Sequence, residues 1–104
     1  MALDKMAFGM EVRRQRNLKR VVEDVHAKKE IGRRLVAEAG ALDLTATAAA
    51  DMAGCSRRTW FSYESGDTTP DAVMLRRLDE LGFDVQFLVT GRRSRRRSYR
   101  KSVG

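Results

Sequence analysis

Apolar side chains recur at helical spacing over most of the chain, which predicts a mostly helical protein. Between residues 11 and 31 there is neither glycine nor proline, and apolar residues alternate with Arg, Lys and Glu at a period near 3.6. We therefore expect an amphipathic helix here, with an apolar stripe made of Leu18, Val21, Val22 and Val25. The helix either runs unbroken into a second stripe that begins at Ile31, or bends near Lys28 and folds back.

The middle of the chain predicts two short helices around a tight turn. Residues 46–53 are rich in alanine, the best helix former, and follow Thr45, a residue type that caps helix N-termini. Gly54 ends this segment, and Ser56 can cap the next helix. Trp60 falls on the inward face of that second helix, so we expect it in the core.

The next segments carry a third helix start and one ambiguous pattern. Thr69 as N-cap and Pro70 at the first helical position predict a helix with a leucine stripe that reaches Gly82. Residues 83–89 then alternate apolar and polar side chains at period two, which predicts a short strand, with a short helix as the alternative. Gly32 and Gly40 are interpreted as punctuation at helix ends. The expected fold class is all-α, with four to five helices and a possible strand at 83–89.

Length and charge define the expected organisation. A chain of 104 residues has room for one compact domain with extensions, here a helical extension at 1–29, a domain at 30–91 and a tail at 92–104. Up to Gly91 the chain carries 14 basic and 14 acidic side chains, so its net charge of +7 comes from the tail. We expect this tail to be disordered and to order on a polyanion. Its basic residues are Arg92, Arg93, Arg95, Arg96, Arg97, Arg100 and Lys101.

Several classes of protein are disfavoured. The single Cys55 forms no internal disulfide, and the single His26 has no neighbouring ligands for a metal site. No nucleophile, acid-base pair or phosphate-binding loop is recognisable, so we expect neither an enzyme nor a cofactor. No apolar run is long enough for a membrane span, and the first residues do not look like a secretory signal. A cytoplasmic protein with no membrane partner is the expectation.

Together, these segments resemble the phage repressor and Cro family of helix-turn-helix proteins, often called XRE-like, over about residues 31–91. The resemblance rests on the order and spacing of several pieces rather than on any one of them. These are Ile31-Gly-Arg-Arg-Leu35, Leu42-Asp-Leu-Thr45, Ala50-Asp-Met-Ala-Gly-Cys-Ser56, Ser56-Arg-Arg-Thr-Trp-Phe-Ser-Tyr-Glu-Ser-Gly66 and Pro70-Asp-Ala with Leu75 and Leu78.

The resemblance implies a DNA-binding function and assigns contacts by position. Exposed residues near the start of the second short helix would touch base edges in the major groove: Arg57, Arg58 and Ser62. Arginine can bond the O6 and N7 atoms of guanine with both arms of its guanidinium, so we expect guanine-containing half-sites. Phosphate contacts are expected from the hydroxyls of Thr45, Ser56, Ser65 and Thr68. The arginines of the tail (Arg92, Arg93, Arg95, Arg96 and Arg97) are expected to add non-specific phosphate contacts.

The chain departs from the family pattern at two positions. Ala46 stands where many relatives carry a contact-fixing glutamine, so more of the readout would fall to Arg57 and Arg58. Ala39 stands where some relatives have an arginine that pairs with the glutamate matching Glu64. Glu64 would then reach Arg34 or Arg76, or face water.

The resemblance implies a transcriptional regulator, most simply a repressor that occupies a palindromic operator as a homodimer. Two surfaces are candidates for dimerisation, namely the stripe Leu18, Val21, Val22 and Val25, and the segment around Phe87. One alternative is an antitoxin that binds a toxin protein and represses its own gene. Another is an RNA-binding or nucleoid protein that acts through the arginine-rich tail.

Overall fold

The computed structural model describes residues 2–94, with side chains from residue 16 onward, and within this range it is all-helical. Five helices and no strand are present in the part described. They are α1 (Ala2–Ala41), α2 (Ala46–Ala53), α3 (Arg57–Ser65), α4 (Ala72–Glu80) and α5 (Val85–Thr90). The predicted all-α class is confirmed. The possible strand at 83–89 is wrong, because α5 occupies this segment.

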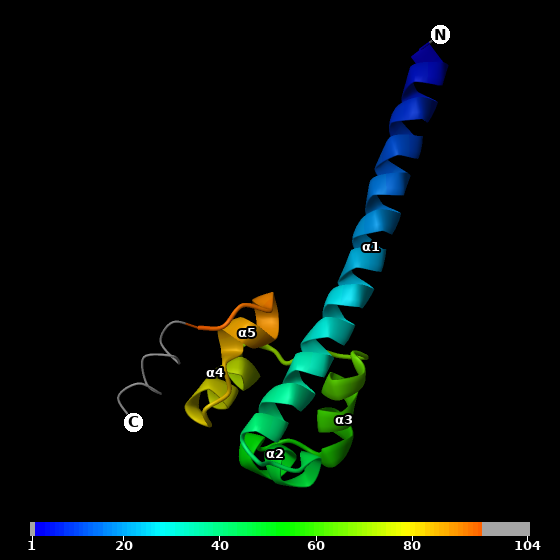
Figure 1. Cartoon of the computed structure of the whole chain (residues 1–104). Coiled ribbons are helices and arrows are strands. Elements are labelled where there is room, and N and C mark those ends of the chain that lie inside the picture. Colours follow the sequence, from blue (N-terminus) through cyan, green and yellow to red (C-terminus); the bar gives the residue numbers. More distant parts are fainter. Residues whose placement is uncertain (1, 95–104) are drawn as a thin grey trace.

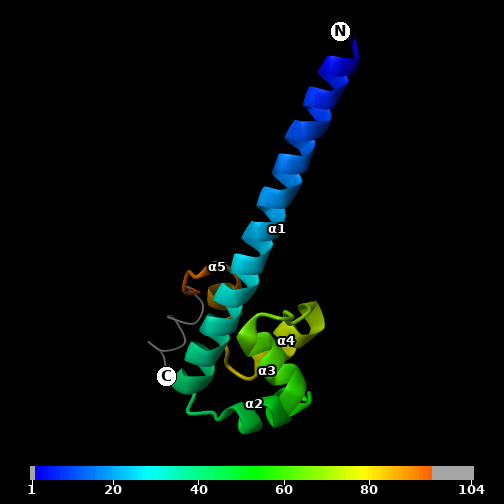
Figure 2. The ribbon, with the colours of Figure 1, turned by 90° about the vertical axis from the view of Figure 1, so that its right-hand side faces the viewer.

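Helix α1 runs unbroken for 40 residues, so the alternative of a bend near Lys28 does not occur. At 1.5 Å per residue it is about 60 Å long. Its C-terminal part packs against α3 and α5, while its N-terminal part extends beyond the other helices in both views (Figures 1 and 2). The molecule therefore consists of a small helical body and a projecting rod.

Helices α2 and α3 begin and end where the sequence predicts. The Thr45 hydroxyl accepts the Ala48 N–H at 3.1 Å and the Ser56 hydroxyl accepts the Thr59 N–H at 3.0 Å, so both N-caps are confirmed. Gly54 adopts a left-handed conformation, with φ 76°, and its N–H bonds back to α2. A three-residue turn thus separates the two helices.

The core forms around Trp60, which is completely buried. Phe83 lies edge-on to the indole at a centroid distance of 6.1 Å, a favourable aromatic geometry. Small alanines on α2 allow that helix to approach closely, and Leu35 of α1 and Leu88 of α5 close the remaining sides. The indole Nε1 of Trp60 is buried without a hydrogen-bond partner among the described residues.

Helix α3 lies against α1 at Gly32. A Cβ atom at this position would lie 2.4 Å from the Glu64 carbonyl oxygen and 2.6 Å from that of Tyr63, both backbone atoms. Only glycine leaves room for this approach, so Gly32 is a packing residue within α1 and not punctuation at a helix end. Gly40, in contrast, has open space where its side chain would be.

Two local predictions fail for related reasons. Helix α4 is capped by Asp71, which accepts the Met74 N–H at 2.8 Å, so Thr69 is not the N-cap and Pro70 precedes the helix. Similarly, the Asp84 carboxylate accepts the Phe87 N–H at 3.2 Å and starts α5 within the predicted strand. In both cases an aspartate N-cap decided where a helix begins, against the predicted Thr69 cap in α4 and against the period-two alternation at residues 83–89.

Candidate nucleic-acid interface

The first turn of α3 presents two adjacent arginines to solvent. Arg57 and Arg58 are exposed, and neither forms an ion pair within the described part of the chain. The Arg57 guanidinium lies 5.4 Å from the centroid of the Phe61 ring, which is itself 45% exposed. Trp60, which lies between Arg58 and Phe61 in the sequence, is buried in the core. The buried tryptophan thus fixes the orientation of α3, while the face that carries the two arginines stays exposed to solvent.

A hollow with a volume of about 390 Å³ lies beside Arg58, between α3 and the loop that follows it. Arg58, Ser62 and Thr68 contribute to its lining, together with Thr59, Tyr63 and Thr69. The hydroxyls of Ser62 and Thr68 are hydrogen-bonded to each other at 2.9 Å. The structure therefore brings together a predicted base-contact residue and a predicted phosphate-contact residue.

The other predicted phosphate contacts already make hydrogen bonds within the chain. Thr45 and Ser56 use their hydroxyl oxygens as N-caps, and the Ser65 hydroxyl donates to the Ser62 carbonyl at 3.1 Å. A capping hydroxyl fixes the first turn of its helix, where backbone N–H groups without intrahelical partners can bind an anion. At Thr45 and Ser56 the backbone of the first helical turn, rather than the side chain alone, offers donors to a phosphate.

The tail begins as an ordered segment anchored to the body, which the prediction of disorder from residue 92 did not anticipate. Arg93 forms an ion pair with Glu38, which is fully buried, and lies 3.9 Å from the carboxylate of the buried Asp84. Its guanidinium also stacks over Phe87, 3.8 Å from the ring centroid. Arg93 is therefore held by two carboxylates and an aromatic ring of the protein. Arg92 is exposed, and Arg95, Arg96 and Arg97 lie outside the described residues.

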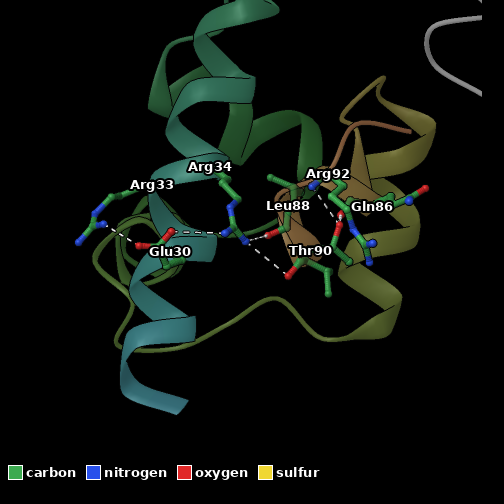
Figure 3. A network of polar contacts seen from close by, with 8 residues as sticks. Glu30, Arg33, Arg34, Gln86, Leu88, Thr90 and Arg92 are labelled. Carbon is green, nitrogen blue, oxygen red and sulfur yellow. Dashed lines mark hydrogen bonds and ion pairs between the residues drawn. The ribbon is translucent and has the colours of Figure 1, made fainter. Parts of the chain in front are cut away.

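Backbone contacts continue this anchoring. The Ser94 N–H donates to Asp84 at 2.9 Å, and the Asp84 N–H donates to Glu38 at 2.9 Å. In Figure 3 the Thr90 hydroxyl donates to the Gln86 carbonyl and accepts the Arg92 N–H. The end of α5 thus leads into a fixed segment that lies across α1 from α3 in Figures 1 and 2.

The expected partners of Glu64 are engaged elsewhere. Arg34 pairs with Glu30 at 3.3 Å and donates to the Leu88 and Val89 carbonyls, tying α1 to the C-terminus of α5 (Figure 3). Arg76 lies 3.6 Å from Glu80 on its own helix. Neither arginine is paired with Glu64, whose backbone carbonyl instead lies against Gly32.

The two candidate dimerisation surfaces differ in how far the chain itself covers them. Leu18, Val21, Val22 and Val25 are 47–61% exposed. Phe87 is half-buried beneath the Arg93 guanidinium, and its neighbour Leu88 is fully buried in the core. The stripe on α1 is the larger free apolar surface of the two.

Burial affects two titratable side chains near the α2–α3 turn. It raises the pKa of the Cys55 thiol above its ordinary value, an effect that the nearby Arg77 partly opposes. Burial likewise raises the pKa of the Tyr63 phenol. The thiol at this position is held in its protonated, less nucleophilic form. Among the side chains described, no group of three or more His, Cys, Asp and Glu residues is arranged to hold a metal ion.

Comparisons of the chain with protein-family models, with curated proteins and with solved structures found no match. Within residues 2–94, no helix combines the length and the apolar content that a membrane span requires. The candidate interface therefore rests on the residues and geometry of this chain alone.

Proposed function

We propose that this protein is a sequence-specific DNA-binding transcriptional regulator, a homodimeric repressor that reads the major groove with α3. The observation that carries the proposal is the first turn of α3. There, Arg57 and Arg58 are exposed and form no ion pair with another described residue, and Arg58 lines a hollow together with Ser62 and Thr68. A helix fixed from behind by a buried tryptophan is suited to this task, because base readout requires side chains held in a defined position.

The arrangement of α2 and α3 supports the helix-turn-helix part of the proposal. The two helices have eight and nine residues, and a three-residue turn with a left-handed glycine joins them. Ala50 of α2 is buried in the core, and a small side chain at this position allows the second helix to pack closely. In this arrangement the second helix enters the major groove and its first residues contact the bases.

The charge distribution assigns different tasks to different segments. Residues 30–91 carry six basic and ten acidic side chains, so the body by itself does not attract DNA. Residues 1–29 carry eight basic and four acidic side chains, and residues 92–104 carry seven basic side chains and no acid. Under the proposal, Arg57 and Arg58 select the sequence, and the two terminal segments supply most of the salt-dependent affinity.

The same charge distribution favours one rival, a nucleic-acid-binding protein that acts through its tail alone. In that case the helical body would not choose a sequence, and RNA would serve as well as duplex DNA. The two functions predict opposite results for substitutions in α3.

Selection of binding sites from a random duplex pool distinguishes them. The double variant Arg57→Ala/Arg58→Ala should lose the selected sequence, with an affinity loss of about tenfold to a hundredfold per arginine. Arg76→Ala is the matched control, because Arg76 is an exposed arginine on α4 that pairs with Glu80 of the same helix. It should select the same sites as the wild type.

Tail dependence is tested with a chain that ends at Ser94, which keeps the Arg93 anchor. It should retain the sequence preference while its affinity depends less on salt, by about 0.9 in the logarithmic slope for each phosphate that the tail no longer neutralises. Retention of the preference by the α3 double variant would refute base reading by these arginines. A wild-type protein that selects no sequence would refute the regulator function.

A further inference from the structure

Phe61 is an apolar side chain on the charged face of α3. It is 45% exposed, whereas Trp60 beside it is completely buried. At 3.6 residues per turn, Phe61 lies about 40° around the helix from Arg57 and about 60° from Arg58 in the opposite direction. The ring therefore occupies the middle of the face that the two arginines border.

The surroundings of Phe61 distinguish it from an ordinary exposed apolar residue. Single apolar side chains are common on protein surfaces and by themselves indicate no partner. Here, however, the ring lies between two arginines that are exposed and form no ion pair with another described residue. A partner that covers this face must therefore offer an apolar group next to hydrogen-bond acceptors or negative charges.

The contact between Arg57 and Phe61 places these two requirements side by side. The central guanidinium carbon of Arg57 lies 5.4 Å from the centroid of the Phe61 ring, within the range of a cation–π interaction. This interaction uses the face of the guanidinium and leaves the N–H groups at its edge for other acceptors. An acceptor bound by Arg57 is then adjacent to any group that touches the ring.

The major groove of DNA supplies this combination of groups. Guanine presents the O6 and N7 acceptors that a guanidinium binds, and the C5 methyl of thymine is the apolar group that base edges present there. Successive bases of one strand are about 3.4 Å apart, so groups at the separation of the guanidinium and the ring meet neighbouring base pairs. A second copy of the chain is a poorer occupant, because a two-fold contact between these faces brings the arginines of both copies together.

We propose that Phe61 contacts the C5 methyl group of a thymine that neighbours the guanine read by Arg57. The inference rests on the proposed function and adds recognition of a methyl group to hydrogen bonding by the arginines. Each half-site should then contain guanine and thymine in neighbouring base pairs. Burial of one methyl group against the ring corresponds to about a fourfold gain in affinity.

Removal of the methyl group from the DNA tests the contact. In a duplex selected by the wild type, each thymine is replaced in turn by deoxyuridine, which pairs in the same way and lacks only the C5 methyl. Replacement of the thymine beside the guanine should weaken binding about fourfold, measured by fluorescence anisotropy at one fixed salt concentration. At the same position, 5-methylcytosine should bind better than cytosine by a similar factor, because the methyl group is their only difference.

Phe61→Ala tests the residue. Because the ring is exposed, the variant should fold as the wild type does, which circular dichroism checks. It should bind the thymine and deoxyuridine duplexes with equal affinity and still prefer guanine. Val89→Ala is the matched control, because Val89 is a similarly exposed apolar residue on α5, at 49%, and this variant should keep the fourfold difference.

Two results would overturn the methyl contact alone. One is equal affinity of the wild type for duplexes with and without the methyl group at every thymine, and the other is a Phe61→Ala variant that still distinguishes them. In either case the selected sequence and its dependence on Arg57 and Arg58 would remain, so the proposed function would stand. A wild-type chain that selects no sequence would overturn both.

Self-association without DNA gives a separate check on the occupant. Analytical ultracentrifugation should find the same oligomeric state for the wild type and for Phe61→Ala. Loss of self-association in the variant would assign the ring to a contact between copies of the chain and would overturn its contact with DNA.

Discussion

Arg93 is the side chain on which the anchoring of the C-terminal segment depends most. It carries the positive charge beside two buried carboxylates, Glu38 and Asp84, which are 0% and 3% exposed. Replacing Arg93 with alanine removes this charge and leaves both carboxylates in place. We expect the variant to fold with a lower free energy of unfolding.

The magnitude follows from the burial of each partner. Removal of one member of a fully buried ion pair costs about 3–5 kcal/mol. The Arg93 side chain is 52% exposed, so water screens part of its interaction and the expected loss is smaller, about 2 kcal/mol. Removal of the guanidinium from the face of the Phe87 ring adds about 0.5–1 kcal/mol. The total destabilisation should therefore be about 2.5–3 kcal/mol.

Urea denaturation followed by circular dichroism, at one fixed protein concentration, measures the effect. Arg92→Ala is the matched control, since it removes a neighbouring exposed arginine and should change the free energy of unfolding by less than about 0.5 kcal/mol. Glu38→Gln removes the buried charge that Arg93 neutralises. In the double variant Glu38→Gln/Arg93→Ala, the two effects should therefore sum to at least about 1 kcal/mol less than their separate values. Equal stability of the Arg92 and Arg93 variants would refute the reasoning.

Three further predictions concern local features of the fold. Gly32→Ala should destabilise the protein by more than about 2 kcal/mol, because the added Cβ meets two carbonyl oxygens of α3. Gly40→Ala has open space and should leave stability unchanged or raise it by up to about 1 kcal/mol; equal melting temperatures of the two variants would contradict this. Ser56→Ala should cost about 1 kcal/mol through loss of the cap on α3, measured by urea denaturation, and no change would show that the cap is dispensable. Burial raises the pKa of the Cys55 thiol above its ordinary value of 9.0, so the buried, protonated thiol should not lower the free energy of unfolding below pH 9, and ionisation should lower it at higher pH. Alkylation of Cys55 by iodoacetamide at pH 8 should therefore be slower in the folded chain than in the urea-unfolded chain. Equal rates would contradict the raised pKa.

The candidate interface could be predicted from the sequence because its signals are local. Arg57 and Arg58 follow a capping serine, and Trp60 two positions later defines which face of α3 turns inward. The exposure of the two arginines and the burial of the tryptophan follow from helical periodicity alone. The contact between Ser62 and Thr68 also lies within a short stretch of chain.

The anchor of the tail could not be predicted in this way. Glu38 has the sequence appearance of an ordinary charged residue on a solvated helix, and Arg93 that of one cation in a basic run. Their contact joins residues 55 positions apart. The one available signal was that Glu38 follows the apolar Leu35 by three positions and so lies on the same helical face.

The sequence by itself therefore determined the caps, the turn and the helical character of most segments, because capping, glycine conformation and helical periodicity act within a few residues. Tertiary structure decided what depends on packing between distant segments. Gly32 became the closest approach of α1 to α3, and residues 85–90 formed a helix, with Phe83 just before it and Leu88 within it both buried in the core. Arg93, at the start of the basic tail, interacts with two buried carboxylates of the body. In each case the free energy of burying groups against a distant partner outweighed the local pattern.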